Sequence, residues 1–249
     1  MIDLHTHFLP NVDDGADSIE EAVRMARLAV KEGIRHAVLT PHHNRYWVTN
    51  PKEKVLKRIE EVKEAVNAAN VPLTFSPSQE IRMNEEFLEE LLAGNYLPLD
   101  KKGKYYLVEF SWRDFPPFAK EYLKKMIEEG MTPVIAHPER QRAFLDDPEL
   151  LPSLIKMGAI AQVTATSIIG GYSQEIKEAA HEMMKANLIH TIASDAHNTT
   201  DRPFNLTPAL KSLEIEYGVD YKDNLVNNAK RIFESKEIQY FEHPQNNID

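Results

Sequence analysis

The sequence predicts an α/β protein built as a closed or nearly closed parallel barrel of seven βα units, one fewer than the common eight. Short apolar, β-branched stretches alternate along the whole chain with longer segments in which apolar residues recur at helical spacing. No internal repeat, low-complexity stretch or linker interrupts this alternation. The length of 249 residues lies within the range that such barrels occupy as one unit. We therefore expect one domain over residues 1–249.

The predicted strands are the short apolar stretches rich in β-branched residues, which are typical of a buried parallel sheet. We expect them at residues 2–5, 35–40, 72–76, 105–110, 132–136, 159–163 and 188–193.

The predicted helices lie between and after these strands. In the first, Ser18 and Glu21 form a capping box, and apolar residues then recur at helical spacing until Gly33 ends the helix. Pro51 stands where the first residue of the next helix is expected. Further helical segments begin near Asn84, Phe118, Ile176, Pro208 and Tyr221.

Composition excludes several classes of function. The chain contains no Cys, so no cysteine nucleophile of the kind used by common tyrosine phosphatases is available. A net charge of −10 argues against nonspecific binding to nucleic acid or to an anionic membrane. No apolar run is long enough to span a bilayer, and no apolar segment typical of a signal peptide follows Met1. We therefore expect a cytoplasmic protein.

Potential metal ligands stand at the C-terminal ends of six of the seven predicted strands. This end of a barrel is where its enzymes place their chemistry. Any one of these residues alone could be a polar residue at a strand end that bonds to its neighbours or to water. Potential ligands at six strand ends on one rim favour a metal centre. Only the sixth strand, which leads to Thr164 and Thr166, offers no ligand. The candidates are His5, His7, His42, Glu80, Glu109, His137, Asp195 and His197.

Asp13 and Asp14 follow the first strand, in a loop that the barrel places over the rim. An acidic turn before a helix is the alternative reading, but we expect Asp14 to be a further ligand. His43 should face away from its neighbour His42 because adjacent strand residues point to opposite sides. The remaining histidines are expected to be surface or packing residues: His36, His181, His190 and His243.

Two arginines follow the candidate ligands closely, Arg140 after His137 and Arg202 after His197. A guanidinium presents parallel donors that match the edge of a phosphate group. The alternative is a surface ion pair of each arginine with its neighbour, Glu139 or Asp201. We expect both arginines to bind an anion, which favours a phosphoester as substrate.

These residues give the chain a resemblance to the PHP (polymerase and histidinol phosphatase) superfamily, and most closely to its bacterial manganese-dependent protein-tyrosine phosphatases of capsular and exopolysaccharide synthesis. The match runs nearly end to end, without departure at the nine expected ligands. Its motifs are residues 2–7, 13–15, 40–43, 109–110, 137–140 and 194–197, together with Glu80.

The resemblance implies a distorted, TIM-like barrel of seven units that holds three Mn²⁺ ions, with iron or zinc as alternatives for this donor set. A hydroxide activated by two of the ions would attack phosphorus directly, and the third ion with Arg140 and Arg202 would bind the phosphate. The implied substrate is the phosphotyrosine tail of a bacterial tyrosine kinase that governs polysaccharide assembly. By the family pattern, His5, His7, Glu109 and Asp195 hold the first ion, Glu80, Glu109 and His137 the second, and Asp14, His42 and His197 the third.

Three other functions compete with this one. A small-molecule phosphatase, such as a histidinol phosphatase, would share the same centre. An amidohydrolase is less favoured because no lysine ends the fourth strand and the eighth strand is missing. The third is a metal-binding module without catalytic activity. Aromatic residues expected in the rim loops could either flank a phenyl ring or pack the loops; they are Tyr46, Trp47, Trp112, Phe115 and Phe118.

Overall fold

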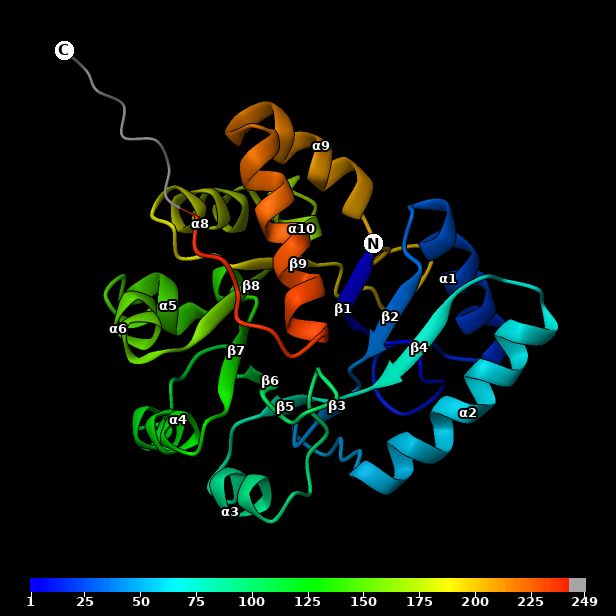
Figure 1. Cartoon of the computed structure of the whole chain (residues 1–249), viewed down its shortest axis with the longest axis horizontal. Helices are drawn as coiled ribbons and strands as arrows, with labels where there is room; N and C mark the ends of the chain where they lie inside the picture. The colour runs from blue at the N-terminus through cyan, green and yellow to red at the C-terminus, as the bar shows by residue number, and fades with distance from the viewer. Residues whose placement is uncertain (242–249) are drawn as a thin grey trace.

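The computed structural model describes residues 1–241, and His243 lies outside this range. Strands and helices alternate as expected, with helices around the outside of the strands (Figure 1). The strands are β1 (Ile2–Thr6), β2 (His36–Leu39), β3 (His42–His43), β4 (Thr74–Pro77), β5 (Glu80–Arg82), β6 (Tyr105–Glu109), β7 (Thr132–Ala136), β8 (Ile160–Thr164) and β9 (Thr191–Ala193). The helices are α1 (Ile19–Lys31), α2 (Lys52–Ala68), α3 (Phe87–Leu92), α4 (Ala119–Glu128), α5 (Arg142–Asp146), α6 (Leu150–Met157), α7 (Ala165–Ile168), α8 (Gln174–Lys185), α9 (Leu206–Tyr217) and α10 (Val219–Phe233).

The barrel is distorted because its second and third strands are each broken in two. Three strands pair in the order β1-β2-β4 and six in the order β3-β5-β6-β7-β8-β9, and every pairing is parallel. Pro41 separates β2 from β3, since proline has no N–H to give to the ladder. The backbone bonds continue across both breaks, from the Ser78 N–H to the Leu39 carbonyl (2.8 Å) and from the Glu80 N–H to the Pro41 carbonyl (3.1 Å).

The last strand returns to the first and closes the barrel. The His7 N–H donates to the Ala196 carbonyl at 2.9 Å, and the Asp195 N–H donates to the His5 carbonyl at 3.0 Å. Thr6 and Ala196 form a parallel bridge. Counting each broken strand once gives the seven units that the sequence predicted.

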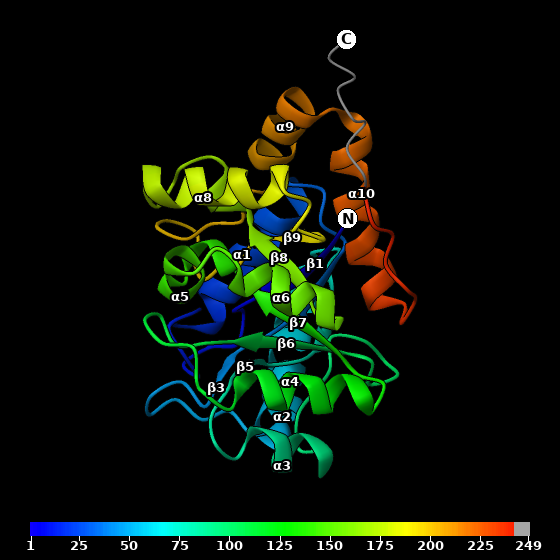
Figure 2. The same cartoon turned by 90° about the vertical axis from the view of Figure 1, so that its left-hand side faces the viewer.

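The end of the barrel opposite the rim is filled by apolar side chains. Leu4, Leu107 and Val134 form one buried cluster with Ala229 and Ile232 of α10. In Figure 2, α10 lies on the right of the barrel, on the side opposite the loop that joins β3 to α2. The polar rim is therefore carried by a packed base, which fixes the directions of the strand ends.

The capping box expected at α1 is only half formed. The Ser18 hydroxyl accepts the Glu21 N–H at 3.2 Å, as predicted. The Glu21 carboxylate instead accepts the Thr199 N–H at 2.7 Å and pairs with Arg24. A partner from the far end of the chain thus replaces the local one, so the prediction of a reciprocal box is wrong.

His36, His181 and His190 lie away from the rim and have partners of their own. His36 contacts the Thr74 and Ser76 hydroxyls. His181 contacts the Tyr217 hydroxyl at 2.7 Å, and Nδ1 of His190 accepts the Ala161 N–H at 3.1 Å. Within residues 1–241, no helix has the length and apolar character needed to cross a membrane.

The free energy of unfolding is expected to fall by about 2 kcal/mol between about pH 7 and pH 5 through His190 alone. Burial lowers the pKa of this ring from 6.5 to about 4. Its neutral form therefore contributes stability that is fully present above the unfolded pKa and is lost as the pH falls towards the folded pKa. Urea unfolding at both pH values should show this loss for the wild-type protein relative to His190→Gln. Equal pH dependence of the two proteins would contradict the assignment.

Candidate metal centre

The nine expected ligands come together at the rim, from strand ends and loops far apart in the chain. Three overlapping groups each bring one possible ligand atom per residue within 4.8 Å of the others. They are His5, His7, Glu80 and Asp195; His7, Asp14, His42 and His197; and His42, Glu80 and Glu109. His137 joins them through Glu80, whose Oε1 lies 2.7 Å from its Nε2. We call these nine residues the His–carboxylate cluster.

Glu80 occupies the centre of the cluster. Its Oε2 lies 2.6 Å from His42 Nδ1, 3.3 Å from His5 Nε2 and 3.5 Å from His7 Nε2. Burial alone would raise the pKa of this carboxyl, but His42 and His5 outweigh burial and hold the pKa well below its usual range. Glu80 is therefore ionised at neutral pH, as a metal ligand must be.

Glu109, the expected bridging ligand, lies beside His42 and Glu80 and also contacts an arginine. Its Oε2 pairs with Nη2 of Arg82 at 3.1 Å and lies 3.9 Å from His42 Nδ1. Arg82 belongs to the neighbouring strand, β5. Glu80 belongs to two of the three groups and contacts His7 and His42 of the remaining one.

Asp195 connects the cluster to both predicted anion-binding arginines. Its Oδ1 lies 3.3 Å from His5 Nε2, while its Oδ2 accepts from Arg202 Nη2 at 3.0 Å and contacts Arg140 Nη1. Burial would raise the pKa of Asp195, but Arg202 and Arg140 outweigh burial and lower the pKa far below its usual value. The two guanidinium groups thus converge on one edge of the cluster.

The alternative pairing of Arg140 with Glu139 is wrong. The Glu139 carboxylate accepts the Thr164 N–H at the end of β8 and the Ser167 hydroxyl in α7. Arg140 instead lies over the ring of Tyr172, 4.7 Å from its centroid. Arg202 also reaches the rim loop after β1, where its Nη1 is 3.4 Å from Asp14 Oδ2.

Asp13 has a supporting position that the sequence reasoning missed. Its Oδ2 accepts from His7 Nδ1 at 2.8 Å and from the His42 N–H at 3.0 Å. Burial would raise its pKa, but the His7 ring outweighs burial and lowers the pKa to about 2. A carboxylate on the far nitrogen of a ligating imidazole fixes the ring's orientation and tautomer. The two adjacent acids were a signal for this pairing, because one can bind a metal ion while the other orients a ligating histidine.

Gly15 holds the same loop against β1. A Cβ atom built at Gly15 would lie 2.3 Å from the His7 carbonyl oxygen, so a side chain has no room there. The close approach brings Asp13 to Nδ1 of the His7 ring and Asp14 to the open side of the cluster, where its Oδ1 lies 3.2 Å from His42 Nε2.

Gln162 and Arg45 are also at the centre, and the sequence did not single out either of them. Gln162 comes from β8, the strand expected to contribute nothing, and its Oε1 is 2.8 Å from Nδ1 of His5. Arg45, in the loop after β3, contacts His42 Nε2 and lies 3.3 Å from Asp14 Oδ2. A lone polar residue in an otherwise apolar strand was the available signal for Gln162.

His43 points away from the cluster, as expected. Its Nδ1 accepts the Asn50 N–H at 3.1 Å, and its ring packs edge-on against Tyr96. Burial lowers its pKa, which keeps the ring neutral. His43 therefore supports the loop and takes no part in the cluster.

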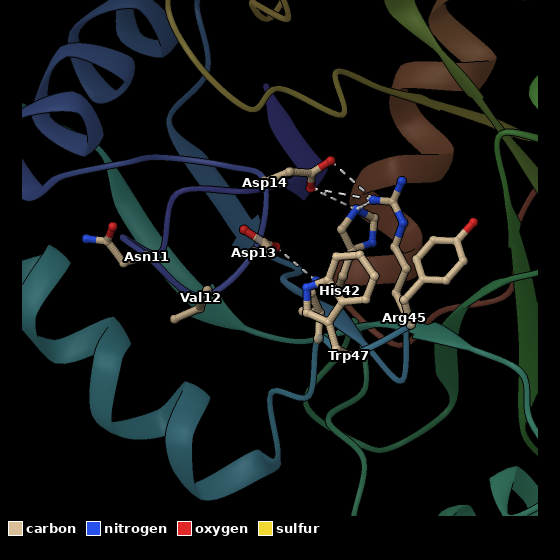
Figure 3. A pocket seen from close by; sticks show the side chains of 9 residues that line it. Asn11, Val12, Asp13, Asp14, His42, Arg45 and Trp47 are labelled. Carbon is tan, nitrogen blue, oxygen red and sulfur yellow. Dashed lines mark hydrogen bonds and ion pairs between the residues drawn. The ribbon is translucent and has the colours of Figure 1, made fainter.

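An open pocket of about 620 Å³ adjoins Asp14 and His42. Figure 3 shows the Asp13–Asp14 loop on one side of it and His42, Arg45 and Trp47 on the other. Among the rim aromatics, Tyr46 and Trp47 line this pocket. Phe115 instead packs on Phe110 and Phe144, and Phe118 packs on Tyr122. Trp112 is half exposed.

The donor set fits metal ions. Buried carboxylate oxygens and imidazole nitrogens converge at short range: Glu80 Oε2 lies 2.6 Å from His42 Nδ1, and Asp195 Oδ1 lies 3.3 Å from His5 Nε2. Buried charges are paired or coordinate metal ions, and these two residue types bind a metal ion when the imidazole is neutral and the carboxylate ionised. Imidazole nitrogen with carboxylate oxygen and no thiolate suits manganese, iron or zinc.

Comparison with known proteins agrees with this geometry. Residues 1–234 match the family of capsular polysaccharide synthesis proteins CpsB/CapC. The chain belongs to the CpsB/CapC family. Within that family, it is 37% identical to the tyrosine-protein phosphatase YwqE of Bacillus subtilis, over 96% of this chain and 93% of YwqE. It is 32% identical to the putative tyrosine-protein phosphatase CapC of Staphylococcus aureus, with the same two coverages of 96% and 93%.

A solved structure extends the likeness to the whole fold. It comes from work on YwqE of Bacillus subtilis and CpsB of Streptococcus pneumoniae, described as unique metal-dependent tyrosine phosphatases. The two structures superpose with a TM-score of 0.93 over 98% of each chain, at 37% identity. The predicted resemblance to the bacterial metal-dependent tyrosine phosphatases is therefore confirmed.

Proposed function

We propose that this protein is a metal-dependent protein-tyrosine phosphatase that acts on phosphotyrosine in a bacterial tyrosine kinase of polysaccharide assembly. The observation that carries the proposal is the convergence of a buried His–carboxylate cluster with Arg140 and Arg202 on Asp195. Relatives named as tyrosine-protein phosphatases support the choice of substrate. The kinase tail as partner and a cytoplasmic location belong to the same proposal.

The nine residues of the His–carboxylate cluster would hold the metal, which we propose to be three Mn²⁺ ions, with iron or zinc as alternatives. Bound divalent ions would supply positive charge and lower the pKa of water from about 15.7 towards about 7. Asp13 and Gln162 hold the His7 and His5 rings in place by accepting from their far nitrogens. The ligating nitrogens are thereby aimed into the cluster.

Arg140 and Arg202 would bind the phosphate group of the substrate. Their side chains are only 17% and 23% exposed, so their donors are held in place and shielded from water. Both already contact the buried Asp195, and Arg202 also contacts Asp14 on the open side of the cluster. Fixed donors at that edge can stabilise charge that develops on phosphate oxygens during displacement.

The deciding experiment measures phosphate release by the manganese-loaded protein from a phosphotyrosyl peptide, the matching phosphoseryl peptide and histidinol phosphate. We expect the phosphotyrosyl peptide to be the best substrate. Preference for histidinol phosphate would favour a small-molecule phosphatase. No release from any of the three would favour a binding module without catalytic activity.

Asp13→Asn is expected to weaken manganese binding about 10- to 100-fold, because the amide no longer provides a carboxylate for both His7 and the His42 N–H. Isothermal titration of the metal-free protein measures this affinity. Asp17→Asn, in the same loop but exposed, is the matched control and should bind as tightly as wild type. Equal affinity of Asp13→Asn and Asp17→Asn would refute the supporting role of Asp13.

A further inference from the structure

A short hairpin beside the His–carboxylate cluster exposes two large aromatic side chains to solvent. The backbones of Arg45 and Val48 exchange two hydrogen bonds, of 3.2 and 2.8 Å, and so close a tight turn over residues 45–48, the aromatic hairpin. Tyr46 and Trp47 at its tip are 72% and 89% exposed, and their ring centroids are 5.8 Å apart. Such exposure of two neighbouring aromatic rings favours a binding role over a packing role.

The backbone of the aromatic hairpin is held in an unusual conformation. Tyr46 has φ = 54°, in the left-handed region that a bulky residue rarely adopts. Backbone strain of this kind persists where the surrounding structure imposes it, and it is common at ligand clamps. In this turn it places the two rings side by side at the edge of the pocket.

The pocket beside the aromatic hairpin runs directly into the cluster. Its lining includes Asp14 and His42 at one end and Tyr46 and Trp47 at the other. His42 is only 3% exposed, whereas Trp47 is 89% exposed, so the pocket joins a buried cluster histidine to an exposed aromatic ring. Arg45 lies between them and contacts both Asp14 and His42.

A second link ties the aromatic hairpin to the cluster from the other side. Arg82 pairs with Glu109 at 3.1 Å, and its guanidinium carbon lies 5.0 Å from the centroid of the Tyr46 ring. A guanidinium over an aromatic face is attractive. The Tyr46 ring is therefore positioned relative to a cluster residue, although it stands in solvent.

We propose that Trp47 and Tyr46 form the wall of an aryl subsite, which receives the phenyl ring of the substrate while its phosphate group lies at the cluster. This inference rests on the proposed phosphatase function and names the residues that select an aryl ester. Cluster residues and arginines recognise the phosphate group, which phosphotyrosine and phosphoserine share. Trp47 and Tyr46 provide aromatic surface that a phenyl ring covers and that the short side chain of phosphoserine does not reach.

Non-hydrolysable phosphonates test binding at the aryl subsite separately from phosphate release. Trp47→Ala should raise the inhibition constant of benzylphosphonate about tenfold, a change of about 1.4 kcal/mol, and leave that of methylphosphonate unchanged. Trp47→Phe, which keeps an aromatic ring, should restore most of the affinity for benzylphosphonate. Ile215→Ala, which removes an exposed apolar side chain of α9, is the matched control and should change neither constant.

A binding signal that does not depend on turnover completes the test. The chain has two tryptophans, so Trp112→Phe leaves Trp47 as the single fluorophore of this type. Saturation with benzylphosphonate should change the fluorescence emission of Trp47, and saturation with methylphosphonate should not. The aryl subsite would be overturned if Trp47→Ala bound both phosphonates more weakly, or if it bound both as tightly as the wild type does. Failure of the wild-type protein to release phosphate from any phosphomonoester would overturn the proposed function instead.

Discussion

Replacement of Glu80 by glutamine is expected to lower kcat/KM for a phosphotyrosyl peptide about a thousandfold and to reduce the bound metal. Glu80 lies within 3.5 Å of three cluster histidines through one oxygen and contacts His137 through the other. The amide has nearly the same shape but lacks the negative charge that offsets clustered cations. Metal content per folded chain and initial rates measure the two effects separately.

Asp100→Asn is the matched control for Glu80→Gln. Asp100 is also a buried carboxylate, but it accepts N–H groups from Lys102, Lys104 and Tyr105 at the opposite end of the barrel. Its substitution should lower the thermal midpoint and leave the metal content unchanged. If Asp100→Asn lost metal as Glu80→Gln does, general destabilisation would explain both results.

Arg140→Ala should reduce turnover about a hundredfold while the metal content stays that of wild type. The variant loses one fixed phosphate donor, but Asp195 keeps its pair with Arg202 and so remains ionised and in place. Arg140→Lys should recover part of the loss, because it restores charge without the paired donors of the guanidinium.

Arg142→Ala provides the control for charge removal near Arg140. Arg142 is half exposed and pairs with Asp146 and Glu175, away from the cluster. We expect its turnover to match the wild type. Turnover of Arg140→Ala equal to that of Arg142→Ala would show that Arg140 does not bind the phosphate.

The sequence was sufficient to predict which residues meet at the rim, because parallel strands present their C-terminal ends on one side. His5, Glu80 and Asp195 could be placed together from strand positions alone, although they are far apart in the chain. The strand period also gave the outward direction of His43. These features depend on local pattern and on one rule of barrel geometry.

The sequence could not show which side chain contacts which partner within the rim. Glu80 contacts His42, whereas Glu109 pairs with Arg82, and this difference depends on side-chain positions a few ångströms apart. The bond from Gln162 to His5 joins residues 157 positions apart. Glu21 likewise bonds to a residue distant in the chain, Thr199, and not to its local capping partner. The short helices α5, α6 and α7 were missed: α5 and α7 are too short to show a helical period, and α6 carries Pro152 although Leu150, Leu151 and Leu154 recur at helical spacing.

Closure of the barrel by the first and last strands has a consequence for synthesis at the ribosome. His5 and His7 are made well before their backbone partners, Asp195 and Ala196. Domains generally fold as units during translation, at about 5–20 residues per second. The nascent chain therefore cannot complete the His–carboxylate cluster until β9 and the residues that follow it have left the exit tunnel, so the full set of candidate metal ligands forms only after that point.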